Sequence, residues 1–212
     1  MNRKIILTVA MTLAIVSDAW TKSEGKPPVV FTDACDCKGD HAAYRWAAKT
    51  TLPAHPIQAT KKAIKPSDVF GWAVATDPIG KHTARLGGRE RTYYKVTGRI
   101  IMVRLEDDCD MHILLGDATG TRQGKVIVEI PKGPQWCDLR QRVFGWMGEN
   151  FHPLPSSGKD WQPKTNFVVT VTGPAFFDAE HHTSSDPAAN ERPGPFQPNT
   201  SIWELHPVTG IK

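Results

Sequence analysis

Carboxylates and imidazoles recur at alternate positions in two parts of the chain where strands are expected. Asp110 and His112 are separated by one apolar residue, and so are Glu204 and His206. Side chains on a strand alternate between its two faces, so each pair is predicted to lie on one face of its own strand.

Asp178 and His181 extend this set at the point where another expected strand runs into a long loop. If the strands are neighbours, imidazole nitrogens and carboxylate oxygens would form a site for zinc or manganese, or an acid–base pair. The candidate metal ligands are Asp110, His112, Asp178, His181, Glu204 and His206, and the candidate catalytic residues are His112, His181, Glu204 and His206. The alternative is an ordinary hydrogen-bonded cluster, since His-x-x-x-His and Cys-x-x-Cys motifs are absent.

A second set of candidates is basic. Between residues 81 and 104, lysines and arginines are opposed only by Glu90, although the formal net charge of the whole chain is a modest +4. Such cations can contact the phosphates of a single-stranded nucleic acid, or another anionic polymer, while aromatic rings stack on bases. The candidate ligand-binding residues are Tyr93, Lys95, Arg99 and Arg104. A solvated basic strand face is the alternative interpretation.

The elements that must position these residues are mainly strands. Residues 111–116 and 125–131 alternate in polarity around a turn with two glycines, which predicts a hairpin with one buried face and Ala118 opposite Lys125. Residues 92–105 form a longer predicted strand, and Gly98 in its middle indicates a bulge or a sharp bend.

One helix and two further strands follow the hairpin. Residues 136–150 have helical spacing, a Pro/Ser/Gly-rich connector covers 152–163, and strands are predicted at 166–173 and 201–206. This order predicts a mainly β fold: a five-stranded OB-like antiparallel barrel with one helix after the third strand. Its ligand-binding loops would be residues 106–110 and 179–200.

The C-terminal segments resemble those of a group of OB-fold-like exported bacterial proteins of unestablished function. The resemblance rests on the sequence Val-Thr-Gly-Pro-Ala-Phe-Phe-Asp at 171–178, on His181, and on Trp-Glu-Leu-His-Pro-Val at 203–208. It covers about residues 96–211, implies the OB-like fold, and assigns no catalytic residue. A thermonuclease-like enzyme is disfavoured, because the arginine-led strand and Gly-Ile-Asp sequence of that family are missing.

The N-terminus predicts export. Residues 1–19 are expected to be a signal peptide, with Arg3 and Lys4 before an apolar run and small residues before the expected cleavage after Ala19. Residues 20–90 are then an irregular N-terminal arm, with one short helix at 40–49, and residues 91–212 are the barrel domain. We expect a periplasmic or secreted protein with no transmembrane segment in its mature form.

The four cysteines lie in the exported part, where disulfides can form. The hairpin register places Cys109 close to Cys137, so we expect this pair to be bonded. For Cys35 and Cys37 the sequence leaves three roles open: a disulfide to a partner, a metal ligand or a free thiol.

Three functions from different classes remain at this point. The first is an exported OB-like binding module for single-stranded nucleic acid or another anionic polymer. The second is a metal-assisted hydrolase that uses the histidines and carboxylates, and the third is a structural or host-interaction protein. Serine hydrolase, phosphate-loop and dinucleotide-binding motifs are absent from the sequence.

Overall fold

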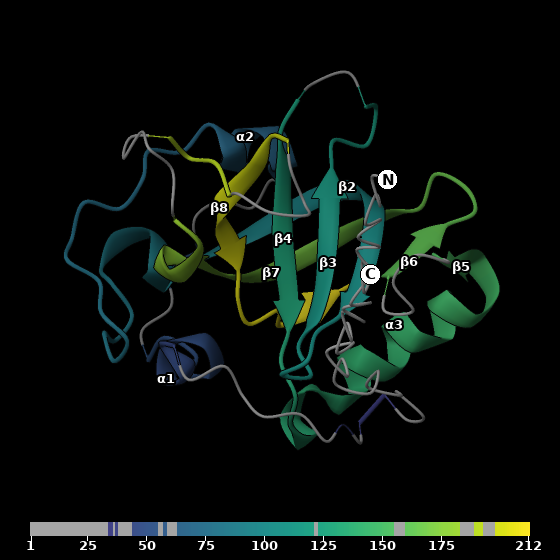
Figure 1. The fold of residues 1–212 in the computed structure, drawn as a ribbon, viewed down its shortest axis with the longest axis horizontal. Coiled ribbons are helices and arrows are strands. Elements are labelled where there is room, and N and C mark those ends of the chain that lie inside the picture. Colours follow the sequence, from purple (N-terminus) through teal and green to yellow (C-terminus); the bar gives the residue numbers. More distant parts are fainter. Residues whose placement is uncertain are drawn as a thin grey trace, which may run out of the picture.

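The structure, a computed structural model, describes residues 34–35, 37, 44–54, 57–58, 63–120, 123–154, 160–182, 189–192 and 198–212. It is mainly β, and its strands belong to one sheet (Figure 1). Successive neighbours in the sheet are β2 (Thr92–Leu105), β3 (Met111–Gly116), β4 (Lys125–Ile130), β8 (Thr200–Leu205) and β7 (Val168–Phe177). Since β2 also pairs with β7, these strands form a partly closed ring, in which only β4 and β8 run parallel.

The predicted hairpin is confirmed, but its predicted register is wrong by two residues. Gly116, not Ala118, pairs with Lys125. The chain leaves the ladder at Asp117 because this carboxylate accepts hydrogen bonds from the backbone N–H and the hydroxyl of Ser67, at 2.9 and 2.7 Å. Ser67 belongs to α2 (Pro66–Phe70), which packs against β4 and β8.

The ring is covered more completely than the alternating pattern predicted. Every residue of β3 is buried, on both faces of the strand. One face carries Ile113 and Leu115 into the main core, and Leu114 on the other face joins Met102 and Ile127 in a second apolar cluster. The prediction of one exposed face is therefore wrong for this hairpin.

Gly98 has a packing role and is not the position of a bulge. The register between β2 and β3 shifts two residues later, between Ile100 and Met102. A Cβ at Gly98 would lie 2.6 Å from the carbonyl oxygen of Gly116 and 2.8 Å from Pro66. Glycine at this position therefore allows a close approach of β2 to the end of β3.

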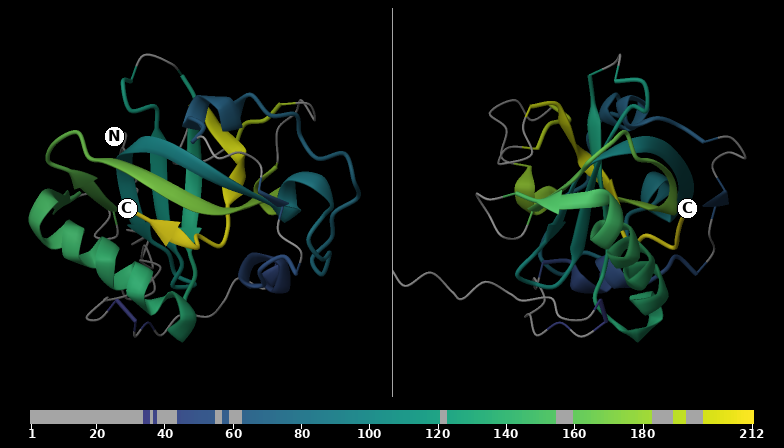
Figure 2. Two further views of the ribbon diagram at one scale, coloured as in Figure 1. Left: turned by 180° about the vertical axis from the view of Figure 1, so that it is seen from behind. Right: turned by 90° about the vertical axis from the view of Figure 1, so that its right-hand side faces the viewer.

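The helix after the third ring strand is confirmed as α3 (Cys137–Asn150), and its Val143 and Met147 face the core. The connector expected at 152–163 is wrong in its described parts, where β5 (Phe151–Pro153) pairs with β6 (Asp160–Pro163) and β6 pairs with β2. The Arg104–Asp160 ion pair, 2.5 Å from Nε to Oδ1, adds a side-chain link at this junction. Figure 2 shows α3 beside the ring in the left view and in front of the strands in the right view.

The N-terminal part contains α1 (Trp46–Thr50), β1 (Ile57–Gln58), α2 and the short helix η1 (Gly88–Arg91). The expected helix at 40–49 is present only from Trp46 among the described residues, and the predicted signal peptide lies outside them. Arg45 anchors α1 to the ring: it is 1% exposed, pairs with both carboxylate oxygens of Glu90 and donates to the carbonyl of Phe177. A last short strand, β9 (Gly210–Ile211), pairs with β7.

The predicted Cys109–Cys137 disulfide is wrong. Cys137 is bonded to Cys35 and Cys109 is bonded to Cys37. The prediction failed because it treated the hairpin end as a closed unit, whereas the N-terminal segment lies against it and supplies both partners. The carbonyl of Ala34 also accepts a hydrogen bond from Arg140 of α3, at 2.6 Å.

Within the part of the chain that is described, no helix combines the length and the hydropathy needed to cross a membrane.

Candidate functional site

Glu129 of β4 lies at the centre of a buried group of charges. Its Oε1 contacts Nε2 of His112, and its Oε2 lies 2.5 Å from Nδ1 of His206. The other nitrogen of His206, Nε2, lies 3.6 Å from Oδ2 of Asp110. Oε2 of Glu204 is 3.9 Å from Nδ1 of His206, which brings a third carboxylate to the same imidazole.

Arg192 connects this centre to the remaining predicted residues. Its Nη1 contacts Glu204 and lies 3.0 Å from Oδ2 of Asp178. The same Asp178 oxygen is 2.6 Å from Nδ1 of His181. All six predicted metal-ligand candidates therefore belong to one network, which we call the buried charge cluster. The cluster also includes Glu129 and Arg192. Lys49 belongs to it because its positive charge interacts with the buried carboxylates.

The strand register explains the convergence. His112 of β3 pairs directly with Glu129 of β4, and Glu204 of β8 pairs with Ile127 two residues earlier on β4. His206 follows β8 directly, where its backbone N–H donates to the carbonyl of Pro174 at 3.0 Å. Neighbouring strands thus present these side chains from one end of the ring.

Burial separates the centre of the cluster from its edge. Glu204 and His206 are 0% exposed, and the side chain of His181 is 46% exposed. Asp178 and Arg192, which lie between them, are also buried. His181 is therefore the member through which this side of the cluster reaches solvent.

The histidines at the centre favour their protonated forms in this arrangement. Burial alone would lower the pKa of His112, but the Glu129 carboxylate outweighs it and raises the pKa to about 9. His206 has the same balance between burial and Glu129, and its pKa is also about 9. Two imidazolium ions can therefore balance part of the buried negative charge.

The pKa values of the carboxylates shift in opposite directions. Burial would raise the pKa of Glu129, but His112 and His206 hold it well below its usual range. Burial raises the pKa of Asp110 to about 6 and that of Glu204 above its usual value. At the edge, burial opposes ionisation of Asp178, yet the hydrogen bond with His181 and the charge of Arg192 lower its pKa to about 2.

Three members of the cluster were missed as site candidates in the sequence. Glu129 was assigned to the polar face of its strand, although its pairing with His112 would have followed from the correct hairpin register. Arg192 lies in the long loop before β8, and Lys49 lies on α1 in the N-terminal arm. No periodic pattern connects these two cations to the strands.

Two groups of side chains in the described regions have donor atoms close enough for a metal ion. The first is Asp110, Glu129 and His206, all buried, and the second is Asp178, Glu180 and His181, nearer the surface. In the second group Arg192 already pairs with Asp178, and its positive charge opposes a cation there.

The predicted ligand-binding residues lie on a different surface. Tyr93, Lys95 and Arg99 occupy alternate positions of β2 and therefore share one face. Opposite them on β7 are Pro174, Thr172 and Val168. We call this surface, with Thr97 and Thr170 in its middle, the β2–β7 face. Arg104 lies beyond the register shift and pairs with Asp160, so it is not part of this face.

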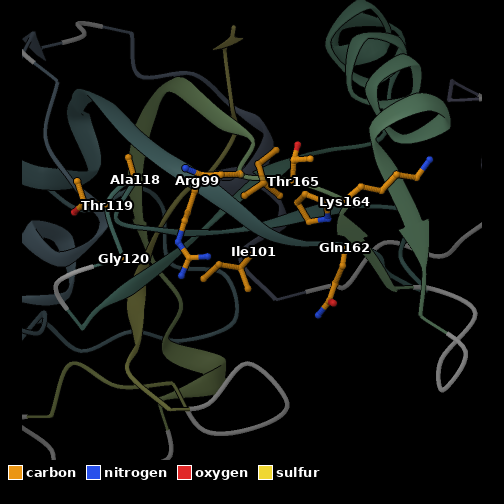
Figure 3. A pocket seen from close by; sticks show the side chains of 11 residues that line it. Arg99, Ile101, Ala118, Thr119, Gly120, Gln162, Lys164 and Thr165 are labelled. Carbon is orange, nitrogen blue, oxygen red and sulfur yellow. The ribbon is translucent and has the colours of Figure 1, made fainter.

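A hollow of about 570 Å³ lies at the Arg99 end of the β2–β7 face (Figure 3). The Arg99 side chain extends toward Gly120, whose ideal Cβ position is 3.7 Å from Nη2. Its Nε is buried and has no hydrogen-bond partner among the described residues. Lys164 also lines the hollow, although its side chain extends away from Arg99 in Figure 3.

A second hollow of about 540 Å³ lies at the Lys95 end of the same face. Its lining includes Lys95, Arg142 of α3 and Lys212, together with Thr170 and Thr172. The β2–β7 face therefore has a basic hollow on each side of the Thr97–Thr170 hydrogen bond.

No family model matches this chain, and neither a curated protein nor a solved structure matches it.

Proposed function

We propose that the protein is an exported OB-like binding module and that its β2–β7 face binds an anionic polymer. The observation that carries this proposal is Arg99. It places a guanidinium in a polar hollow, with a buried Nε that no described residue satisfies. A phosphate, sulfate or carboxylate group entering the hollow would pair with this guanidinium and, once the side chain turns toward it, would supply the acceptor that Nε lacks.

The extended form of the ligand follows from the second hollow. Lys95 and Arg99 are four residues apart on one strand, which corresponds to about 13 Å at the usual rise of a strand. A single small anion would contact one of these cations, whereas a chain with repeated negative groups would contact both. Single-stranded nucleic acid and acidic polysaccharide share this chemistry, and the half-buried Tyr93 offers one ring at the same face.

The OB-like barrel is our interpretation of the ring. It has the expected number and order of ring strands, and α3 follows the third of them. Two disulfides support export, because such bonds persist in oxidising compartments such as the periplasm and the extracellular space. The two loops that the OB-like fold led us to expect at the ligand, residues 106–110 and 179–200, instead contribute Asp110 and Arg192 to the buried charge cluster.

A metal-assisted hydrolase is less well supported. Of its candidate catalytic residues, Glu204 and His206 are 0% exposed and His112 is 8% exposed. The fourth candidate, His181 at the edge of the cluster, has a side chain that is 46% exposed. A substrate needs contact with the reacting groups, so the burial of three of the four candidates argues against the hydrolase.

The proposal is tested by measuring affinity for two labelled polymers, a single-stranded oligothymidylate and heparin, across a range of salt concentrations. We expect at least one polymer to bind with a salt-dependent affinity. The double variant Lys95→Gln/Arg99→Gln should then bind at least tenfold more weakly. For nucleic acid, each lost phosphate contact should lower the slope of log affinity against log salt by about 0.7.

The matched control is Lys81→Gln/Arg91→Gln, which removes the same charge from exposed positions outside the β2–β7 face. Equal weakening in both double variants would mean that net charge alone attracts the polymer. That result, or no binding of either polymer at low salt, would contradict the proposed function.

A further inference from the structure

We infer that Asp110, Glu129 and His206 form a binding site for one divalent cation of the zinc or manganese class. The site is separate from the β2–β7 face and does not depend on the proposed function. One donor atom from each of the three residues lies within 4.8 Å of the other two. Two carboxylates and one imidazole are a donor set that both metals accept.

The distances fit an ion after small side-chain movements. Zinc–ligand bonds of about 2.0–2.2 Å place two tetrahedral ligands about 3.3–3.6 Å apart. The distance from Nε2 of His206 to Oδ2 of Asp110 is 3.6 Å. Oε2 of Glu129 lies 2.5 Å from the other ring nitrogen, Nδ1, so this carboxylate must turn to join an ion bound to Nε2.

Unsatisfied donor atoms point independently to a missing ligand. Nε2 of the fully buried His206 lacks a hydrogen-bond partner among the described residues, whereas its Nδ1 already faces Oε2 of Glu129 at 2.5 Å. Oδ2 of Asp110 is also buried without a hydrogen-bond partner among these residues. Buried polar atoms rarely remain without partners, and a metal ion would satisfy both Oδ2 of Asp110 and Nε2 of His206.

The buried negative charge favours a cation at this position. Four buried carboxylates, Asp110, Glu129, Asp178 and Glu204, face two side chains that are permanently positive, Lys49 and Arg192. In the metal-free cluster the protonated forms of His112 and His206 balance the other two charges, and a bound ion would replace the proton of His206. Because all three ligands are buried, the ion would hold β4 to the chain segments just before β3 and just after β8, and it would not meet a substrate.

The test uses the disulfide-bonded protein, expressed by export, without a histidine tag and without chelator during purification. We expect about one equivalent of zinc or manganese after desalting, measured by elemental analysis. Removal with EDTA should lower the midpoint of thermal unfolding, and returning the same metal should restore it. Cobalt added to the stripped protein should give the visible absorption of a four- or five-coordinate nitrogen–oxygen site.

Asp110→Asn is the most informative variant, because the amide oxygen can still accept the backbone hydrogen bond that Lys132 donates to Oδ1. It should bind the metal at least tenfold more weakly, whereas His82→Asn, which removes an exposed histidine, should bind like the unmodified protein. The inference would be overturned by a metal content below a tenth of an equivalent together with no thermal shift on adding zinc or manganese. Unchanged binding in Asp110→Asn would also overturn it.

Discussion

Glu129 is the residue whose neutralisation should most disturb the buried charge cluster. It contacts His112 on one side and lies 2.5 Å from His206 on the other, and it is 1% exposed. Removing one partner of a buried charge network leaves the other charges uncompensated, which typically costs about 3–5 kcal/mol. We therefore predict that Glu129→Gln lowers the free energy of unfolding by this amount, measured by urea denaturation.

The control for this variant is Glu106→Gln. Glu106 also faces His112, at 3.3 Å, but its side chain is 29% exposed, so its ion pair is screened by solvent. We expect a loss below about 1 kcal/mol for this change. Equal losses in the two variants would show that burial of Glu129 does not set its importance.

His112 leads to a prediction about pH. Its pKa is about 9 in the folded chain against 6.5 for an unperturbed histidine, so the folded state holds the proton more tightly. The stability that this provides is fully present below pH 6.5 and is lost as the pH rises through 9. Denaturation of the metal-free protein, with chelator present, should therefore show a falling free energy of unfolding between these values. A constant free energy over that interval would contradict the assignment.

The candidate residues were only partly predictable, because sequence patterns report on positions within one strand and not on residues that meet in the folded chain. Asp110, His112, Glu204 and His206 were found because period-two spacing within one strand is a local pattern. Arg192 joins them through an ion pair made from a loop, and Lys49 through the interaction of its charge with the carboxylates from α1; neither leaves such a pattern. Glu129 could have been found from the pairing of β3 with β4, but an error of two residues in the register moved it away from His112.

At the scale of the elements, one disulfide attaches the N-terminal segment to the residues just before β3, and the other attaches it to the first residue of α3. Cys109 precedes β3 and Cys137 begins α3, and each is bonded to a cysteine at position 35 or 37. Bonds that close loops of this length are worth about 4–5 kcal/mol in the chain-entropy description.

We predict that Cys37→Ser/Cys109→Ser lowers the free energy of unfolding by about 2–5 kcal/mol. The measurement is urea denaturation of the variant beside the unmodified protein. Non-reducing peptide mapping of the unmodified protein should recover the pairs Cys35–Cys137 and Cys37–Cys109. Recovery of a peptide that links Cys109 to Cys137 would contradict the structure.

The strands of the ring were more predictable than the segments around it. β2 and β3 have the bounds that their apolar periodicity predicted, and α3 begins one residue later than expected. β5 and β6 were missed because they are short and lie in a segment rich in proline, serine and glycine. Their pairing is stabilised by contacts with β2, including the ion pair of Arg104 with Asp160, and these contacts are not visible in a local pattern.

At the scale of the whole molecule, the charged residues divide into two groups with different roles. The buried charge cluster lies at one end of the ring and is largely closed to solvent. The β2–β7 face carries its cations on the outside of the ring, beside two hollows. We therefore assign internal cohesion to the first group and recognition of an external anion to the second.

The most direct test of this assignment is an NMR titration of the Arg99 guanidinium with oligothymidylate and with heparin, in protein labelled with nitrogen-15 arginine. The resonance would be assigned with Arg99→Lys. We predict that at least one polymer shifts the Arg99 Nε–H signal strongly and saturably, because the bound anion supplies an acceptor to a group that has none among the described residues. The signal of the exposed Arg91 should change little. An Arg99 signal that stays unchanged while polymer binding is detected elsewhere in the spectrum, or no binding of either polymer, would contradict the account.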